Sequence, residues 1–242
     1  MHNTVEESKT SPHNHSHQVL RSIKQLYGKK LAASDGDFGH VKDFYFDDQR
    51  WVVRYVIVDA GSWLPGRLVL ISPHAFGNFY QDGDWLLVNQ TRKEIENSPP
   101  IESQKPVSRQ YEEEHYRYYG YPSYWNGTEL WGGAGFPVIP KPDLTQPNEE
   151  SQYVRSSNGE DPHLRSTKEV GGYQIQAREG EIGHVTDFMI NEKSWAIDHL
   201  VIKTGQWFFG KEIAFSLKDI DRISYEESKV FVNVMPDAIR GQ

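Results

Sequence analysis

The chain lacks cysteine altogether over its 242 residues. This absence excludes disulfide bonds, thiolate metal sites and a cysteine nucleophile. Long apolar runs are missing too, and without one of about 18 residues no helix can span a membrane. The first residues are polar, whereas a signal peptide needs an apolar stretch of about 7 to 15 residues. We therefore expect a soluble, cytoplasmic protein with no membrane span.

Enzyme motifs and a basic charge excess are also missing. The chain has no G-x-S-x-G elbow, P-loop lysine pattern, H-E-x-x-H helix or Rossmann glycine fingerprint. Its 34 acidic residues outnumber 26 Lys and Arg, which gives a formal net charge of −8. Such a charge repels phosphate backbones. We predict a protein that is not an enzyme, has no catalytic residue and no cofactor, and binds no nucleic acid.

An internal repeat organises what is present. Residues 20–89 align without a gap with residues 164–233, at a constant offset of 144 positions. Identical pairs recur along the whole alignment and include Ser22 and Ser166, Gly39 and Gly183, His40 and His184, Asp43 and Asp187, Trp51 and Trp195, Trp63 and Trp207, and Gly66 and Gly210. The spacing predicts two copies of one domain.

The local pattern of each copy is typical of β structure. Acidic and glycine residues at 35–39 and 179–183 favour a tight hairpin turn. Residues 51–59 and 195–203 are rich in β-branched and aromatic side chains and predict the most buried strands. Serine-led segments at 72–76 and 216–220 predict one helical turn each. The fold class we expect is all-β, with two small antiparallel barrels in tandem.

Composition divides the chain into four parts. We expect a disordered tail at residues 1–17, a first barrel at 18–97, an aromatic and proline-rich linker at 98–161, and a second barrel at 162–242. The linker is irregular because prolines recur in it. Its many tyrosines and tryptophans are unusual for a solvated spacer, so part of it is expected to pack on a barrel or on another subunit. The acidic run at 112–114 could open a short helix.

Several residues could carry chemistry, and each has a structural alternative. His40 and His184 could bind metal or move protons, but each stands at a strand start without other ligands nearby. The carboxylates of Asp43 and Asp187 could act as a catalytic pair, yet they lie in separate copies and are expected to cap or bond their own barrels. The alternating His13, His15 and His17 could hold a transition metal if that segment were ordered. We assign none of them as a metal site.

Two hairpin tips offer a surface for a partner. Trp63 lies beside Arg67 in the first copy, and Trp207 lies beside Lys211 in the second. An aromatic side chain next to a cation is a common contact in protein interfaces. Core packing of the two tryptophans is the alternative. These four residues are the candidate partner-binding site.

The pattern D/E-G-x-x-G-H-V-x-D-F, a β-branched strand and G-x-W-x-x-G-R/K resembles the PRC-barrel family. That family includes the cytoplasmic domain of the photosynthetic reaction centre H subunit and the C-terminal domain of a ribosome maturation factor. The resemblance covers both copies and leaves the linker out. It implies docking and assembly modules without shared catalytic residues, so no site residue is transferred.

Three functions follow as hypotheses. The first is a non-enzymatic protein-binding or scaffold protein in which the two barrels pack as a pseudo-symmetric pair; self-association into a homo-oligomer is compatible with it. The second is an adaptor in a larger assembly, either a photosynthetic electron-transfer complex or ribosome maturation. The third is a metal-binding protein that uses histidines.

Overall fold

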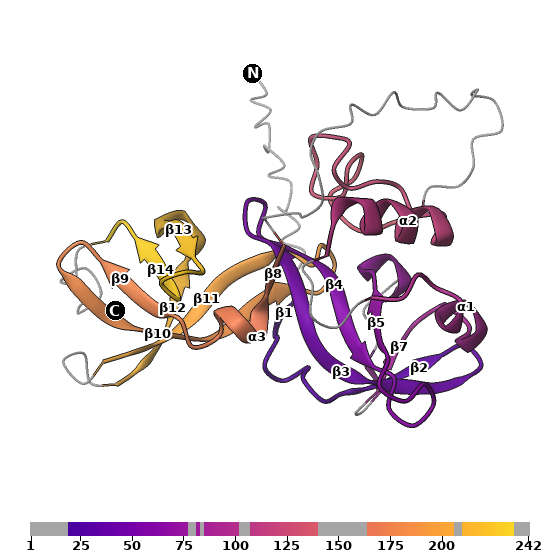
Figure 1. Cartoon of the computed structure of the whole chain (residues 1–242). Helices are drawn as coiled ribbons and strands as arrows, with labels where there is room; N and C mark the ends of the chain where they lie inside the picture. The colour runs from indigo at the N-terminus through magenta and orange to yellow at the C-terminus, as the bar shows by residue number, and fades with distance from the viewer. Residues whose placement is uncertain are drawn as a thin grey trace, which may run out of the picture.

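The computed structural model describes residues 19–76, 81–82, 85–101, 107–139, 164–205 and 210–234 (Figure 1). Strands predominate, in two sheets of seven strands each. The expected all-β class is confirmed. No helix in these ranges is long and apolar enough to cross a membrane. Residues 1–17, for which we expected disorder, lie outside the described residues. The same holds for His13, His15 and His17 within them.

The first sheet has the order β5-β4-β3-β2-β7-β6, and the second has the order β12-β11-β10-β9-β14-β13. The strands of the first are β2 (Lys30–Ala33), β3 (Gly36–Asp47), β4 (Val52–Asp59), β5 (Leu68–Ile71), β6 (Gln81–Asp82) and β7 (Trp85–Leu87). Those of the second are β9 (Gln174–Ala177), β10 (Gly180–Asn191), β11 (Ile197–Thr204), β12 (Glu212–Ser216), β13 (Ile220–Ser224) and β14 (Lys229–Val232). Corresponding strands follow the sequence repeat.

The predicted local elements are largely present. Each copy begins with the expected hairpin, and the serine-led segments form the 3-10 turns η1 (Pro73–Phe76) and η3 (Leu217–Asp219). The expectation of purely antiparallel strands is wrong at one place in each sheet. There β2 pairs parallel with β7, and β9 pairs parallel with β14. A parallel pair is possible because the chain crosses several strands between the two members.

Glycine is required at the start of β3 and β10. Gly39 has φ +152°, and a Cβ atom there would lie 2.2 Å from the carbonyl oxygen of Asp59. Gly183 has φ +158°, and its Cβ would lie 2.3 Å from the carbonyl oxygen of Lys203. Only a residue without a side chain permits this approach of two strands. The repeated glycine therefore fixes the packing of the long hairpin in both copies.

The seventh strand of each sheet comes from the other copy. Strand β1 (Leu20–Ser22) pairs antiparallel with β10, and β8 (Leu164–Ser166) pairs antiparallel with β3. The registers correspond, since Leu20 faces Asn191 and Leu164 faces Asp47. These two segments exchange between the copies, so neither sheet is built from one copy alone.

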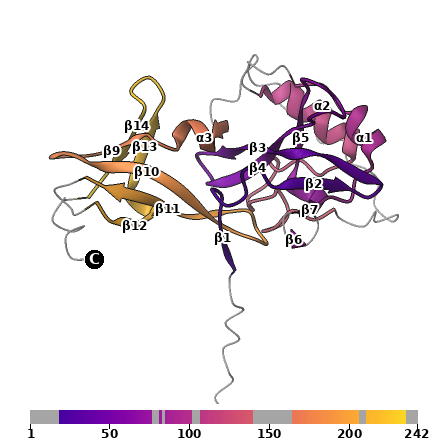
Figure 2. The ribbon, with the colours of Figure 1, turned by 90° about the horizontal axis from the view of Figure 1, so that it is seen from below.

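The two copies also meet directly at the ends of their longest hairpins. Val52 bridges Ala196, its partner at the repeat offset. The amide of Val53 donates to the carbonyl of Trp195 at 2.9 Å, and the amide of Ile197 donates to the carbonyl of Trp51 at 2.7 Å. Figures 1 and 2 show the resulting shape, with the two lobes joined where β3, β4, β10 and β11 meet. The arrangement is the pseudo-symmetric pair that we expected.

Both tryptophans at this contact have left-handed backbone angles, with φ +54° at Trp51 and +58° at Trp195. Such angles are costly for a bulky residue and persist only where the surroundings impose them. Here the carbonyl of each tryptophan accepts the bond that joins the copies. The strained angle therefore directs each carbonyl toward the other half of the molecule.

The segment between the copies is partly helical. After the short helix α1 (Arg92–Glu96), α2 (Arg109–Tyr119) begins at Ser108, whose side chain accepts from the amide of Tyr111, and ends at left-handed Gly120. Helix α2 lies over the first sheet (Figures 1 and 2). Part of the linker, which we expected to pack on a barrel or on another subunit, thus packs on the first sheet, and the acidic run 112–114 lies inside this helix. The short helix α3 (Thr167–Val170) follows β8.

Candidate functional site

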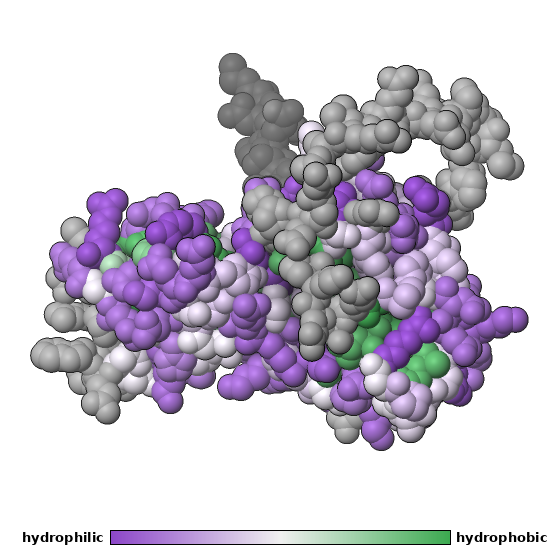
Figure 3. All heavy atoms as spheres, in the orientation of Figure 1, coloured by the Kyte–Doolittle hydropathy of each residue, from purple (hydrophilic) through white to green (hydrophobic). Residues whose placement is uncertain are grey.

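Two regions of the described structure bring together side chains that could bind a ligand or take part in a reaction. The first is a buried cluster between the first sheet and the linker, which we call the linker clamp. It consists of Arg54, Tyr55, His74, Glu112, His115, Tyr116, Tyr124 and Trp131, all 2% exposed or less. The second is an open cleft at the junction of the two copies. The face of the molecule seen in Figure 3 is mostly hydrophilic. The polar groups of the clamp differ from this surface because they are buried.

Arg54 is the cation of the clamp and is fully buried on β4. Its guanidinium donates to the carboxylate of Asp47 at 3.0 Å and to the carbonyl of Leu130 at 2.6 Å. The guanidinium carbon also lies 3.8 Å from the ring centre of Tyr124 and 4.9 Å from that of Trp131. A buried charge needs such paired and stacked surroundings. Arg54 thereby ties the linker to the first sheet.

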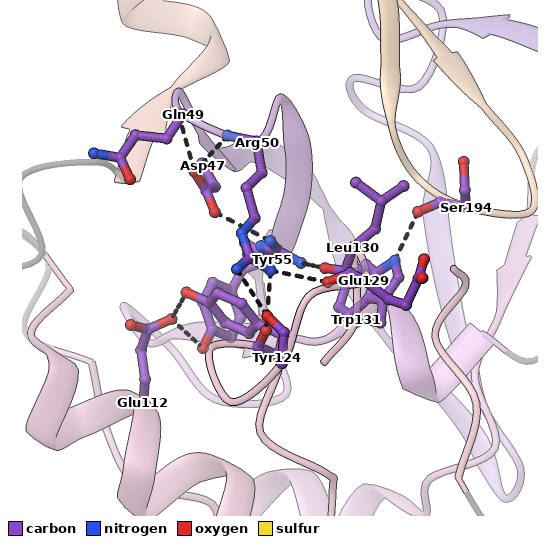
Figure 4. A network of polar contacts seen from close by, with 12 residues as sticks. Asp47, Gln49, Arg50, Tyr55, Glu112, Tyr124, Glu129, Leu130, Trp131 and Ser194 are labelled. Carbon is purple, nitrogen blue, oxygen red and sulfur yellow. Dashed lines mark hydrogen bonds and ion pairs between the residues drawn. The ribbon is translucent and has the colours of Figure 1, made fainter. Parts of the chain in front are cut away.

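Glu112 is the buried anion from α2. Its carboxylate accepts from the hydroxyls of Tyr55 at 2.8 Å and Tyr124 at 2.7 Å (Figure 4). Arg109, one turn earlier, lies 3.0 Å from its second oxygen. Burial and the nearby carboxylate raise the pKa of both tyrosines well above 10. The hydroxyls therefore stay protonated and serve as donors.

Two histidines complete the clamp from opposite sides. His74 belongs to η1 of the first copy, and His115 belongs to α2; the exposed fractions are 2% and 0%. The His115 ring donates to the carbonyl of Leu70 at 3.0 Å, and the His74 ring bonds the Ser72 hydroxyl at 3.0 Å. Burial lowers the pKa of each to about 4, and for His74 the charge of Arg54 adds to this effect. Both rings are neutral at pH 7.

The clamp extends to the second copy. The indole of Trp131 donates to the carbonyl of Ser194 at 2.7 Å (Figure 4). Arg50, in the turn between β3 and β4, donates to the carbonyls of Gly127 and Glu129, at 3.1 and 2.9 Å. The linker thus touches the hairpin ends of both copies. The groups are paired with one another rather than directed at open space, so the cluster can hold the linker in place but presents no accessible nucleophile and base.

Among the described residues, the second copy has no such cover. Arg54 and Tyr55 correspond to Asp198 and His199 at the repeat offset. The side chain of Asp198 is 40% exposed, whereas that of Arg54 is fully buried. All residues of β4 except the last are buried, but β11 alternates between buried and exposed positions. The described part of the linker therefore covers the first copy.

The junction cleft has a volume of about 550 Å³ and is lined by Asp48, Gln49, Trp51, Arg165, Ile220, Asp221, Arg222 and Ile223. These residues come from the turn between β3 and β4, from β8 and from β13. Arg165 donates to Asp48 at 2.6 Å and lies 4.0 Å above the ring of Tyr225. The side chain of Arg222 is 53% exposed. The cleft exists only because β8 has crossed to the first sheet.

The equivalent region in the other half of the molecule is filled rather than open. Trp195 is 1% exposed, and its ring lies 5.1 Å from that of Phe76. At the repeat offset, Phe76 corresponds to Ile220, which lines the junction cleft. Trp51 remains half-buried and borders the cleft. The smaller side chain thus coincides with a more exposed tryptophan and an open space.

Strand β13 contributes four of the cleft residues and ends the order of its sheet. Its neighbour is β14 on one side, and among the described strands none pairs with the other side. A terminal strand presents backbone donors and acceptors that can pair with another chain. The cleft therefore combines an edge strand, a half-buried tryptophan and exposed charges.

The predicted carboxylates have a structural role, but not within their own barrels. Asp43 accepts from the hydroxyl of Ser166 at 2.5 Å and from the amide of Lys168 at 3.1 Å. Asp187 accepts from the hydroxyl of Ser22 and, at 2.9 Å, from the amide of Lys24. Each aspartate bonds the exchanged segment of the other copy, which corrects our expectation. A register shift directly before each aspartate turns its side chain toward that segment.

The predicted histidines are not brought together with metal ligands. His40 and His184 are exposed and face Asp59 and Lys203 across the hairpins. Among the described residues, no group of three or more His, Cys, Asp or Glu side chains could hold a metal ion.

The predicted partner-binding residues differ in their surroundings. Trp63 is half-buried against the core, with the guanidinium of Arg92 4.7 Å from its ring centre. Arg67 donates to the carbonyls of Glu96 and Ser98 at 2.5 and 2.8 Å, so it holds the start of the linker. Lys211 is exposed, and Trp207 lies outside the described residues. Partner binding at these positions stays a prediction.

Comparison with known proteins gives one family. Residues 165–239 match the family model of the PRC-barrel domain. No curated protein matches the chain. The match covers the second copy and begins within β8, so the exchanged strand is part of the domain as the family defines it.

Proposed function

Because residues 165–239 form a PRC-barrel domain, we propose that the chain is a non-enzymatic scaffold that binds an extended segment of a protein partner in the junction cleft. PRC-barrel domains often mediate protein interactions, and the family is generally non-catalytic. The first copy is proposed to be a second PRC barrel, on the strength of its strand order and the repeat.

The observation that carries this proposal is the position of β13 along the cleft. An extended peptide could add to the free edge of Ile220–Ser224 by backbone hydrogen bonds, which supply affinity without a specific sequence. Side chains of alternate peptide residues would then meet the cleft wall. Trp51 and Ile223 offer apolar contact, and the exposed Arg222 offers a charge for orientation.

The test uses the full chain with a photo-crosslinking residue at position 222. We expect it to capture a partner through one extended peptide, identified by mass spectrometry, and Ile223→Asp in the same chain to abolish that crosslink. Lys203, exposed on β11, is the matched control position. Equal capture of the same proteins from positions 203 and 222, or capture that Ile223→Asp leaves unchanged, would refute a partner in the cleft.

A further inference from the structure

The linker clamp places two neutral histidines on opposite sides of one interface. His74 lies in η1, which follows β5 of the first sheet, and His115 lies in α2, which lies over that sheet. The Nε2 atom of His74 and the Nδ1 atom of His115 are buried without a hydrogen-bond partner in the described structure. Water can reach them only if the linker moves away from the sheet.

Few groups around His74 could stabilise a positive charge. Arg54 faces it from β4, and the rings of Tyr121 and Trp131 pack on it at 4.9 and 5.0 Å. Tyr116 and His115 face it from α2. Among the described residues, the charged group that faces His74 is therefore a cation, and a proton on His74 would create two like charges in a water-excluded site.

His115 is surrounded by aromatic rings. Tyr55 faces it from β4, and Tyr111, Tyr116 and Tyr119 face it from α2 itself. Its ring N–H already donates to the carbonyl of Leu70. The carboxylate of Glu112 is bonded to the hydroxyls of Tyr55 and Tyr124 and to Arg109, and that of Asp47 is bonded to Arg54. The nearest acids thus already have partners.

We propose that the linker segment 108–131 is an acid-released cover over the outer face of β4 and β5. Protonation of His74 and His115 charges both sides of the covered interface. Opening the cover lets water solvate both rings while the strands of the sheet stay paired. The device goes beyond the function proposed for the junction cleft, because it needs no partner bound in that cleft.

The face of the first sheet beneath the linker is more apolar than the equivalent face of the second copy. Ile57 and Leu70, neighbours across β4 and β5, are buried beneath the linker at 2% and 1% exposure. Their counterparts Val201 and Ala214 in the second copy are half-buried and exposed. In the second copy, the equivalent positions have no cover among the described residues, while the first copy places larger apolar side chains there. Release would present an apolar surface that is absent at pH 7.

The change in the opening equilibrium with pH follows from the pKa of each histidine in the covered and in the released form. Each has a pKa of about 4 when covered and is expected to have about 6.5 when released. A depressed pKa favours the covered form above pH 6.5 and loses this contribution as the pH falls toward 4. At pH 5 the opening equilibrium should rise by about 30-fold for each histidine and by about 1,000-fold for both, relative to pH 7.5.

The experiment is hydrogen–deuterium exchange of the full chain between pH 7.5 and 5, corrected for the intrinsic exchange rate at each pH. We expect peptides from 108–131 to lose protection as the pH falls, while peptides from β10 and β11 keep theirs. The double variant His74→Gln/His115→Gln should flatten this response, since glutamine can donate to the same acceptors and does not titrate. His40→Gln, at an exposed site, should leave the response unchanged.

Simultaneous loss of protection in the linker and in β10 and β11 would mean global acid unfolding and would overturn the proposal. A full acid response in the double variant would assign the effect to other groups, Glu112 first, and would overturn it as well. If the double variant does not fold, the order of release in the unaltered chain and the response of His115→Gln alone still decide. Crosslinking from position 222 at pH 7.5, where the linker is in place, tests the junction cleft separately.

Discussion

The carboxylate of Asp43 accepts a hydrogen bond from the backbone amide of Lys168, 125 positions further along the chain. The corresponding bond in the other half joins Asp187 to the amide of Lys24 at 2.9 Å. Each aspartate thus anchors the start of one copy to the body of the other. The chain has the architecture of a swapped homodimer whose two subunits have been joined by a linker.

Removal of either aspartate should loosen the exchange. We expect Asp43→Ala to lower the free energy of unfolding by about 2 kcal/mol, because the hydroxyl of Ser166 and the amide of Lys168 lose a charged acceptor. Asp187→Ala should have a similar effect through Ser22 and Lys24. Urea denaturation of the full chain measures both.

Asp221→Ala is the control, because this carboxylate is exposed and bonds no exchanged segment among the interactions described. It should change stability by less than about 0.5 kcal/mol. An equally small effect of Asp43→Ala would show that the exchanged segments do not depend on these bonds.

Glycine at the hairpin crossing is the subject of a second prediction. Gly39→Ala should destabilise the chain by about 3 kcal/mol or more, since its Cβ would lie 2.2 Å from the carbonyl oxygen of Asp59. Gly28→Ala should cost only about 1 kcal/mol, because Gly28 has φ +75° but nothing within 4 Å of a Cβ. Thermal or urea unfolding of the two variants gives the comparison. Equal costs would contradict the steric explanation.

Much of the fold could be predicted because its signals are local. The hairpin near residue 35, the β-branched strand at 51–59 and the serine-led 3-10 turns agree with the prediction, but Gly36 and Gly39 lie inside β3 and the turn itself is at residues 34–35. The repeat supplied the correspondence between the two sheets. The exchange of β1 and β8 could not be predicted, because Ser22 and Asp43 are identical in kind to Ser166 and Asp187. Either pairing, within a copy or between copies, satisfies the same donors and acceptors.

The linker clamp carried a signal that sequence reasoning missed. At the repeat offset, the strand 51–59 differs from 195–203 at outward positions, with Tyr55 against His199 and Leu70 on the next strand against Ala214. A strand without polar alternation is buried on both faces. A comparison of the two copies position by position would have indicated which copy the aromatic linker covers. The partners of Arg54 in the linker could not be found this way, because two of its contacts are a carbonyl and an aromatic ring.

Glu112 provides a third prediction, on the buried anion of the clamp. Glu112→Ala leaves the hydroxyls of Tyr55 and Tyr124 without their acceptor and should cost about 3 kcal/mol. Glu112→Gln keeps an acceptor oxygen for the hydroxyls and loses only the ion pair with Arg109, so it should cost about 1 kcal/mol.

A double-mutant cycle sharpens this test. In the Tyr55→Phe background, Glu112→Ala should cost at least about 1 kcal/mol less than in the unaltered chain, because one unsatisfied hydroxyl has already been removed. Urea denaturation followed by tryptophan fluorescence measures the cycle. Strict additivity would show that the two groups do not act through their bond.

Arg54 and Asp198 occupy equivalent positions in the two copies, but replacement by alanine should be far more costly at Arg54. Arg54→Ala removes a buried guanidinium, takes from the Oδ2 atom of Asp47 and the carbonyl of Leu130 the donor they share, and opens a cavity beneath Tyr124 and Trp131. We expect a loss of about 3 to 5 kcal/mol. Arg54→Lys should also be costly, by about 2 kcal/mol, because an ammonium group cannot bond both acceptors while stacking on a ring.

Asp198→Ala is the matched control at the uncovered position. Its side chain is 40% exposed and bonds only the neighbouring His199 among the described contacts, so the change should be below about 0.5 kcal/mol. Urea denaturation with hydrogen exchange of segment 108–131 shows whether the loss in Arg54→Ala begins in the linker. A stable linker in that variant would mean that the aromatic rings alone hold it on the sheet, and the role of Arg54 as the tie between linker and sheet would have to be abandoned.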